Sequence, residues 1–176
     1  MMERTRTLMA LASLLANVAG CVGTPYDEPP AASKAQQPAS APQTPAIGSK
    51  PEFVRAANVN ANVEALVRSA AEAAQLEARR LVVYVGAPWC EPCTRFHEAI
   101  ERGELDGSLA GIRFLEFDAD QHTPALDAAG YGGRLIPRFA LPDNNGRGTD
   151  QKIEGGVKGE QAVAHIMRRL GTLLAT

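Results

Sequence analysis

The apolar positions after residue 50 predict strands and helices in alternation. The run Leu81-Val82-Val83-Tyr84-Val85 is uninterrupted and rich in β-branched residues, which is typical of a central strand buried on both faces. Further strands are expected where short apolar stretches lie between turn-forming residues: 52–56, 112–118, 138–141 and 151–154. Asn144-Asn145-Gly146 lies between the last two stretches and predicts a hairpin turn.

Helical spacing and capping residues predict two helices in the first half of the domain. One has Asn60 or Asn62 as its N-cap and runs to about Arg79. The other covers 94–102 and stops at Gly103. The residues expected to face the core are Val63, Leu66, Val67, Ala70, Ala74, Leu76, Phe96, Ala99 and Ile100.

Two more helices are predicted in the second half. Thr123 is expected to cap a short helix that has Pro124 at its first position and ends near Gly130. A final amphipathic helix covers 160–174, with a core face of Val163, Ile166, Met167 and Leu170. The resulting order, β-α-β-α-β-α-β-β-α over residues 50–176, predicts an α/β fold with a central mixed sheet and helices on both faces.

The N-terminal stretch has the features of an export signal. Two arginines form a basic start, and an apolar core over 8–18 is too short to cross a bilayer as a helix. The core ends in Val18-Ala19-Gly20-Cys21, which resembles the lipobox of bacterial lipoproteins, where the signal is cut before a cysteine that carries lipid. We expect a signal peptide over 1–20 and a lipid anchor at Cys21. The alternative is an ordinary signal peptide with an incidental cysteine.

Residues 21–49 predict a disordered tether between the anchor and the domain. This stretch is rich in proline and alanine and has few large apolar residues, so it cannot form a core. Val22 stands where inner-membrane retention signals of the enteric type carry Asp, and that resemblance favours the outer membrane. The expected location is the bacterial cell envelope, with the domain facing the periplasm.

Charge and cysteine content narrow the possible functions. The formal net charge is −2, so we expect no nucleic-acid partner. The three cysteines are Cys21, Cys90 and Cys93, which leaves no structural disulfide framework. Cys90 and Cys93 form a C-x-x-C between the predicted central strand and a predicted helix, which is the setting of thiol–disulfide chemistry. The partial positive charge of a helix start favours the Cys90 thiolate.

From the central strand to the C-terminus the chain resembles thioredoxin, and especially the thioredoxin-like domains of bacterial envelope proteins. Trp89-Cys90-Glu91-Pro92-Cys93 corresponds to the family's W-C-x-P-C, and Tyr131-Gly132-Gly133-Arg134-Leu135-Ile136-Pro137 to its segment ending in a cis-proline. Gly155 fits the glycine after the last strand. The resemblance implies a thioredoxin fold and a thiol–disulfide oxidoreductase. Its only redox group would be the Cys90–Cys93 disulfide, without another cofactor or a metal.

The resemblance also implies roles for individual residues. Cys90 would be the nucleophile, and Cys93 would resolve the mixed disulfide. Pro137 would be cis and lie beside the disulfide, so that the backbone of Ile136 pairs with an extended client chain. Trp89 would shape the substrate groove. The alternative for Pro137 is a trans proline at a strand edge.

Two positions depart from the family pattern. Tyr84 stands where thioredoxins carry a buried Asp that is thought to help deprotonate the resolving cysteine. Glu91, His97 and water are candidate proton carriers, although a surface histidine is the simpler interpretation of His97. Arg138 follows the proline where thioredoxins usually have Thr. It would add positive charge near the groove and lower a thiol pKa, or it would point to solvent.

The residues between the cysteines predict the direction of electron flow. Glu91 places negative charge beside the thiolate, and Pro92 matches reducing thioredoxins, so we expect a reductant or moderate exchanger rather than a strong oxidase. Its clients would be protein disulfides. Because the envelope is oxidising, a membrane thiol reductant is the expected electron donor.

Two other classes of function remain open. One is a copper- or metal-handling module that uses Cys90, Cys93 and a histidine. His97 is near in sequence, whereas His122 and His165 are placed by no motif. The other is a redox-silent adaptor that keeps the groove for binding. Intact cysteines argue against the adaptor.

Overall fold

The structure is a computed structural model that describes residues 49–57 and 62–176. The predicted signal peptide, Cys21, the tether up to residue 48, and Asn60 lie outside the described residues. Within the described part of the chain, no helix has the length and apolar character needed to cross a membrane.

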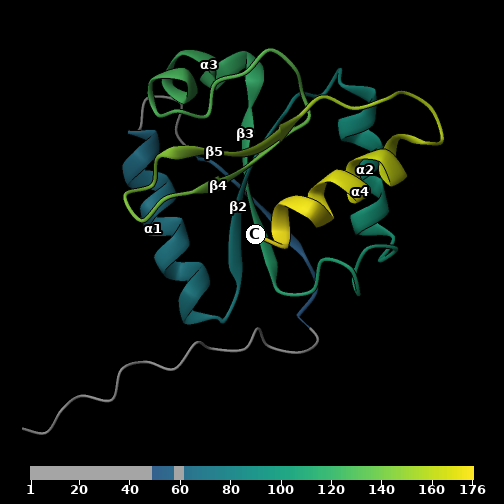
Figure 1. Cartoon of the computed structure of the whole chain (residues 1–176), viewed down its shortest axis with the longest axis horizontal. Helices are drawn as coiled ribbons and strands as arrows, with labels where there is room; N and C mark the ends of the chain where they lie inside the picture. The colour runs from purple at the N-terminus through teal and green to yellow at the C-terminus, as the bar shows by residue number, and fades with distance from the viewer. Residues whose placement is uncertain (1–48, 58–61) are drawn as a thin grey trace, which may run out of the picture. The chain divides into compact units, whose positions relative to one another are not determined.

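The strands of the described residues form one mixed sheet in the order β1-β3-β2-β4-β5. β1 runs parallel to β3, and β3 runs parallel to β2, whereas β2–β4 and β4–β5 are antiparallel pairs. The strands are β1 (Glu52–Arg55), β2 (Arg80–Gly86), β3 (Ile112–Asp118), β4 (Arg138–Pro142) and β5 (Gly148–Glu154). This arrangement places β3, β2 and β4 inside the sheet and the less buried β1 and β5 at its edges (Figure 1).

Helices cover both faces of the sheet. α1 and α3 lie on one face, and α2 and α4 lie on the other (Figure 1). The helices are α1 (Val63–Leu76), α2 (Glu91–Glu101), α3 (Ala119–Ala128) and α4 (Ala162–Leu174). The predicted element order and the predicted α/β class are therefore confirmed.

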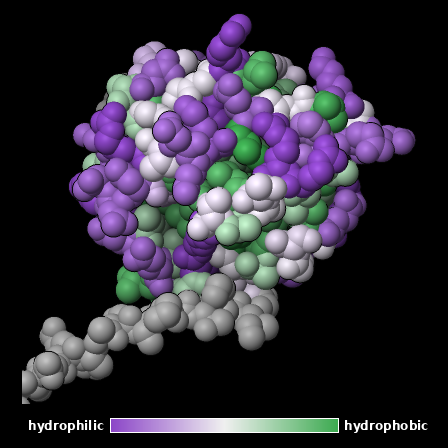
Figure 2. All heavy atoms as spheres, viewed as in Figure 1, coloured by the Kyte–Doolittle hydropathy of each residue, from purple (hydrophilic) through white to green (hydrophobic). Residues whose placement is uncertain are grey.

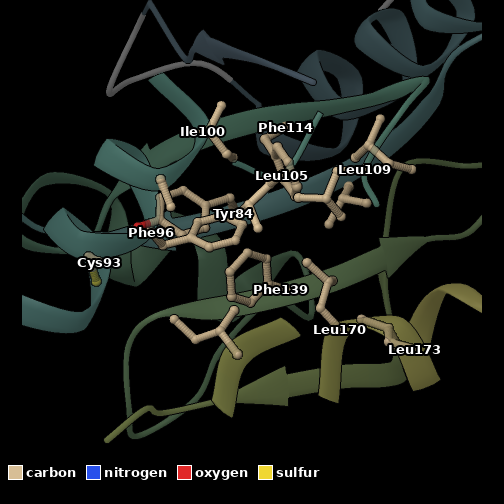
Figure 3. Close-up of a cluster of buried hydrophobic side chains, with 14 of the residues drawn as sticks. Tyr84, Cys93, Phe96, Ile100, Leu105, Leu109, Phe114, Phe139, Leu170 and Leu173 are labelled. Carbon is tan, nitrogen blue, oxygen red and sulfur yellow. The ribbon is translucent and has the colours of Figure 1, made fainter. Parts of the chain in front are cut away.

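Side chains of β2 alternate between the two hydrophobic layers, as its sequence predicts. Val82 and Tyr84 pack toward α2 and α4, whereas Leu81, Val83 and Val85 pack toward α1 and α3. Figure 3 shows the first of these layers, in which aromatic side chains from the sheet meet leucines of α4. Hydrophilic residues cover most of the face seen in Figure 2, with smaller hydrophobic areas between them.

The prediction for α1 was right at its start and wrong at its end. The side chain of Asn62 accepts a hydrogen bond from the backbone N–H of Ala65 at 3.0 Å, so Asn62 is the N-cap. The helix ends at Leu76 rather than near Arg79, and Leu76 is 88% exposed instead of facing the core. The reason is geometric, since Leu76 lies about 220° around the helix from Val63 at 100° per residue.

α3 begins earlier than its capping signals predicted. Asp118 is its N-cap, and its side chain accepts a hydrogen bond from the N–H of Asp120 at 2.8 Å. Pro124 therefore lies inside the helix rather than at its first position. The hydroxyl of Thr123 donates to the carbonyl of Ala119 instead of capping a helix. The aspartate at the end of β3 was thus the stronger start signal.

The remaining differences are small. The predicted hairpin turn is present between β4 and β5, where Gly146 has φ of +82° and donates its N–H to the carbonyl of Asp143 at 3.0 Å. β5 begins at Gly148, three positions before the predicted start, because the hairpin pairing continues to the turn. α2 begins at Glu91 rather than 94, which makes Cys90 its N-cap.

Candidate redox site

Cys90 and Cys93 form a disulfide at the start of α2, with their Cα atoms 5.2 Å apart. Both residues are almost fully buried. The sulfur of Cys90 takes the place of a capping oxygen, because it accepts a hydrogen bond from the backbone N–H of Cys93 at 3.3 Å. Pro92 lies in the first turn, where its missing N–H leaves no bond unmade. The helix start therefore favours negative charge on the Cys90 sulfur.

The proline segment lies next to this disulfide. The peptide bond between Ile136 and Pro137 is cis, as the resemblance implied. Gly156 separates the two prolines of the site: a Cβ on Gly156 would lie 3.1 Å from Pro92 and 3.5 Å from Pro137. Gly155, with φ of +77°, donates its N–H to the carbonyl of Pro137 at 2.8 Å. The residues after β5 thus connect the proline loop to the start of α2.

Apolar side chains are exposed around these prolines. Trp89, directly before Cys90, is 68% exposed, and its indole N–H donates to a carboxylate oxygen of Asp120 at 2.8 Å. Leu135 is 58% exposed and lies against Gly155. Val157, next to Gly156, is also exposed. Large exposed apolar side chains near a reactive group are a common feature of surfaces that bind other chains.

The carboxylate of Glu91 is ionised and hydrogen-bonded to its neighbours. Its carboxylate accepts hydrogen bonds from Arg95 at 2.8 Å and from the backbone N–H of Gly159 at 3.0 Å. These hydrogen bonds, first from Arg95 and then from Gly159, lower the pKa of Glu91. The negative charge predicted beside Cys90 is therefore present and is partly balanced by Arg95.

Tyr84 occupies a buried position beneath the disulfide. The residue is fully buried, and its hydroxyl has no hydrogen-bond partner among the described residues. Its ring packs against Phe53 and Phe139, with centroids 5.3 and 5.2 Å away. Figure 3 shows its hydroxyl pointing to the end of the cluster at which Cys93 lies. Burial, and then the charge of Glu116, raise the pKa of Tyr84, so the phenol stays protonated.

His97 is not the surface histidine of the simpler interpretation. Its Nε2 lies 3.0 Å from a carboxylate oxygen of Glu116, and both side chains are largely buried. Its ring stacks on Phe53 at a centroid distance of 3.8 Å and meets Tyr84 edge-on at 5.4 Å. Packing and hydrogen bonding therefore fix the orientation of the imidazole.

Arg138 does not point to solvent. It is 6% exposed, and its guanidinium donates to the carbonyls of Tyr131 at 2.8 Å and Leu135 at 3.3 Å. Its Nε lies 3.6 Å from a carboxylate oxygen of Glu154. That carboxylate also accepts the backbone N–H groups of Arg134 and Leu135. Arg138 thus holds the loop that leads to Pro137.

A cavity of about 320 Å³ opens behind the disulfide. Cys93 and Tyr84 line it, together with the His97–Glu116 pair. His122 of α3 also lines it, and the Nε2 atom of this buried histidine has no hydrogen-bond partner among the described residues. The cavity therefore brings a redox cysteine, a histidine–carboxylate pair and two unpartnered polar atoms to one place.

Sequence reasoning missed Glu116. Two signals pointed to it: it is an acidic residue between Leu115 and Phe117 in an apolar strand, and it lies opposite Tyr84 in the register of β2 and β3. The first signal was readable from the sequence, but the second needed the register. His165 lies elsewhere, on α4 beside Arg168 and Arg169. Within the described residues, no group of three or more histidine, cysteine or acidic side chains is arranged to hold a metal ion.

Comparisons with known proteins gave structural matches alone. No protein-family model matches the chain, and no curated protein matches it. A thioredoxin from Trichomonas vaginalis matches with 20% identity and a TM-score of 0.46, covering 70% of this chain and 96% of that one. A mutant thioredoxin from Halobacterium salinarum matches with 18% identity and a TM-score of 0.40, covering 70% of this chain and 92% of that one.

The architecture defines the fold class of this chain. The sheet order β1-β3-β2-β4-β5, the paired helices on each face and the cis-proline before β4 form a thioredoxin-like fold. The Cys90–Cys93 pair lies at the carboxyl end of β2, where open α/β sheets place their functional groups.

Proposed function

We propose that this chain is a thiol–disulfide oxidoreductase that acts on protein disulfides through Cys90 and Cys93. The observation that carries the proposal is the Cys90 sulfur at the N-cap of α2, where the N–H of Cys93 donates to it. A sulfur in that environment is stabilised as a thiolate, the form that attacks disulfides. The exposed apolar side chains of Trp89 and Leu135 support a polypeptide as the substrate.

The reaction has two exchange steps. The Cys90 thiolate attacks a client disulfide, forms a mixed disulfide and releases one client thiolate, which takes up a proton from solvent. The Cys93 thiol then loses its proton and attacks the Cys90 sulfur. The Cys90–Cys93 disulfide forms, and the second client sulfur leaves as a thiolate. The client gains two electrons, and the dithiol loses two.

Cysteine variants test this assignment. Cys90→Ser is expected to reduce the rate of client disulfide reduction, with dithiothreitol as the electron source, to the uncatalysed background. Cys93→Ser is expected to keep the first attack and to accumulate the mixed disulfide, which is detected as a mass increase under non-reducing conditions. A Cys90→Ser variant that retains full activity would refute the proposed mechanism.

The reducing direction is part of the proposal. Glu91 is ionised beside Cys90, although Arg95 balances part of its charge, and Pro92 precedes Cys93. Both features favour the oxidised form more than a histidine at this position would. Such a protein needs an external electron donor in an oxidising compartment, and a membrane thiol reductant fits that requirement.

We also propose that the chain is a lipoprotein of the bacterial cell envelope. The support is the sequence Val18-Ala19-Gly20-Cys21 after a basic and apolar start. Cys21→Ala is expected to leave the precursor uncleaved by lipoprotein signal peptidase and to move the protein out of the membrane fraction. Unchanged membrane fractionation of this variant would contradict the lipid anchor.

A further inference from the structure

The second exchange step poses a problem of proton transfer. Cys93 must lose its proton before it attacks Cys90, since the thiolate is the nucleophile. Cys93 is 2% exposed and lies in the hydrophobic layer beneath α2. Bulk solvent is therefore poorly placed to accept the proton, and burial in apolar surroundings works against an isolated thiolate.

The cavity behind the disulfide offers a path for the proton that leaves Cys93. Cys93 lines it directly, and so do two buried groups without a hydrogen-bond partner among the described residues, the hydroxyl of Tyr84 and Nε2 of His122. Buried polar groups are normally satisfied by water where the space is polar and large enough. At about 320 Å³ the cavity has room for several water molecules.

A proton acceptor stands on the wall of the same cavity. Nε2 of His97 lies 3.0 Å from the carboxylate of Glu116, and this hydrogen bond favours the tautomer with the proton on Nε2. The other nitrogen, Nδ1, then carries a lone pair. The stack on Phe53 holds the ring in place.

Tyr84 and Glu116, the two polar neighbours of His97, are poorer acceptors of the Cys93 proton. The raised pKa of Tyr84 keeps its phenol protonated, so it can donate a hydrogen bond but cannot act as a base. Burial alone would raise the pKa of Glu116, but the hydrogen bond and charge of His97 and the charge of Arg55 outweigh burial and lower it. Glu116 is therefore a carboxylate at neutral pH, and a carboxylate beside an imidazole stabilises the imidazolium.

The charged and titratable groups that face this cavity come from every element packed around it. They are Arg55 at the end of β1, Tyr84 on β2, Cys93 and His97 on α2, Glu116 and Asp118 on β3, and His122 on α3. Arg55 lies 3.5 Å from Glu116. Nδ1 of His122 donates to the carbonyl of Asp118 at 3.0 Å, which leaves a lone pair on its Nε2. A carboxylate that would stabilise the protonated ring is paired with His97 through Glu116, whereas the recorded partner of the His122 ring is a neutral carbonyl.

We propose that the His97–Glu116 pair accepts the proton of the Cys93 thiol, through water in this cavity, as Cys93 attacks the mixed disulfide at Cys90. The inference rests on the proposed function. The proton moves from the Cys93 sulfur to Nδ1 of His97, and Glu116 stabilises the resulting imidazolium. The Cys90–Cys93 bond forms, the bond from Cys90 to the client sulfur breaks, and His97 later returns the proton to solvent. His97 and Glu116 are positioning residues in this scheme, because they act on Cys93 through water.

Stopped-flow reaction with one equivalent of 5,5′-dithiobis(2-nitrobenzoate) separates the two cysteines. The full chain carrying Cys21→Ser is reduced and mixed with the reagent, so that only Cys90 and Cys93 react. The first release of thionitrobenzoate reports the attack by Cys90, and the second reports the attack by Cys93. His97→Gln and Glu116→Gln are expected to slow the second release at pH 7 by about tenfold or more. They should change the rate of the first release little.

The pH profile gives a readout that a structural role would not move. In the protein with His97 and Glu116 intact, the second release should accelerate at a lower pH than in His97→Gln, because the variant lacks the base that accepts the Cys93 proton. In His97→Gln the inflection should move up toward the range of an ordinary thiol, about pH 8.5. His165→Gln and Glu98→Gln, which alter the same residue types away from the cavity, should retain the original profile.

The outcomes separate the inference from the proposed function. If the unsubstituted pair Cys90–Cys93 gives no second release and forms no disulfide, the proposed function fails. If both releases occur but the second keeps its rate and its pH profile in both variants, the proton path is overturned while the function stands. Either variant decides the question if the other does not fold.

Discussion

Arg138 shows how a charged side chain is retained inside this domain. Its guanidinium donates to two backbone carbonyls and lies beside the carboxylate of Glu154, which also accepts the N–H groups of Arg134 and Leu135. Burial lowers the pKa of Arg138, but the nearby carboxylate keeps it charged. The side chain therefore replaces the water that these carbonyls and this carboxylate would otherwise need.

Replacing Arg138 should destabilise the domain. Arg138→Ala leaves the carbonyls of Tyr131 and Leu135 without this donor and removes the cation beside the Glu154 carboxylate, so we expect the free energy of unfolding to fall by about 3 kcal/mol. Arg134→Ala, an exposed arginine in the same loop, should change it by less than about 0.5 kcal/mol. Urea denaturation of the two variants measures the difference, and equal stabilities would show that Arg138 does not hold this loop.

The sequence allowed the reactive residues to be predicted, but not their surroundings. Cys90 at a helix start and the cis bond before Pro137 follow from short motifs in which neighbouring residues carry the information. The pairing of His97 with Glu116 joins α2 to β3 and depends on how the helix lies across the sheet. No local pattern contains that geometry, so the sequence favoured a surface position for His97, although His97 was also a candidate proton carrier, and it did not identify Glu116.

Helices and strands were predictable where the apolar pattern was strong. β2 is uninterrupted and apolar, and its burial on both faces followed directly. The predicted start of α3 lies too far along the chain, because Pro124 is a good first-turn residue. The helix in fact starts earlier, where Asp118 supplies the N-cap. In α1 the predicted core face wrongly included Leu76, which is apolar but lies on the exposed side of the helix.

A pair of leucines tests the assignment of helix faces. Leu170 of α4 is fully buried, whereas Leu76 at the end of α1 is 88% exposed. Leu170→Ala should lower the free energy of unfolding by about 2–5 kcal/mol, because it removes apolar contacts and leaves a cavity. Leu76→Ala should change it by less than about 0.5 kcal/mol. A comparable loss from both substitutions would contradict the assigned faces.

The topology of the whole domain explains the location of the Cys90–Cys93 site. β2 and β3 run parallel and end together, so Gly86 and Asp118 meet at one edge of the sheet. α2 starts from that edge and carries Cys90, and the loop before β4 brings Pro137 to the same place. The order of elements could be predicted because each strand and helix has its own pattern. The cavity behind the disulfide could not, since residues of five strands and helices line it together.

The most direct test of this account is the redox equilibrium of the Cys90–Cys93 pair against a glutathione buffer, measured on the full chain carrying Cys21→Ser. We predict a reversible disulfide with a potential near or below about −220 mV, in the range of reducing thioredoxins and glutaredoxins. A potential above about −180 mV would make the protein an oxidase or isomerase and would contradict the reducing role inferred from Glu91 and Pro92. The absence of any reversible disulfide would contradict the proposed function itself.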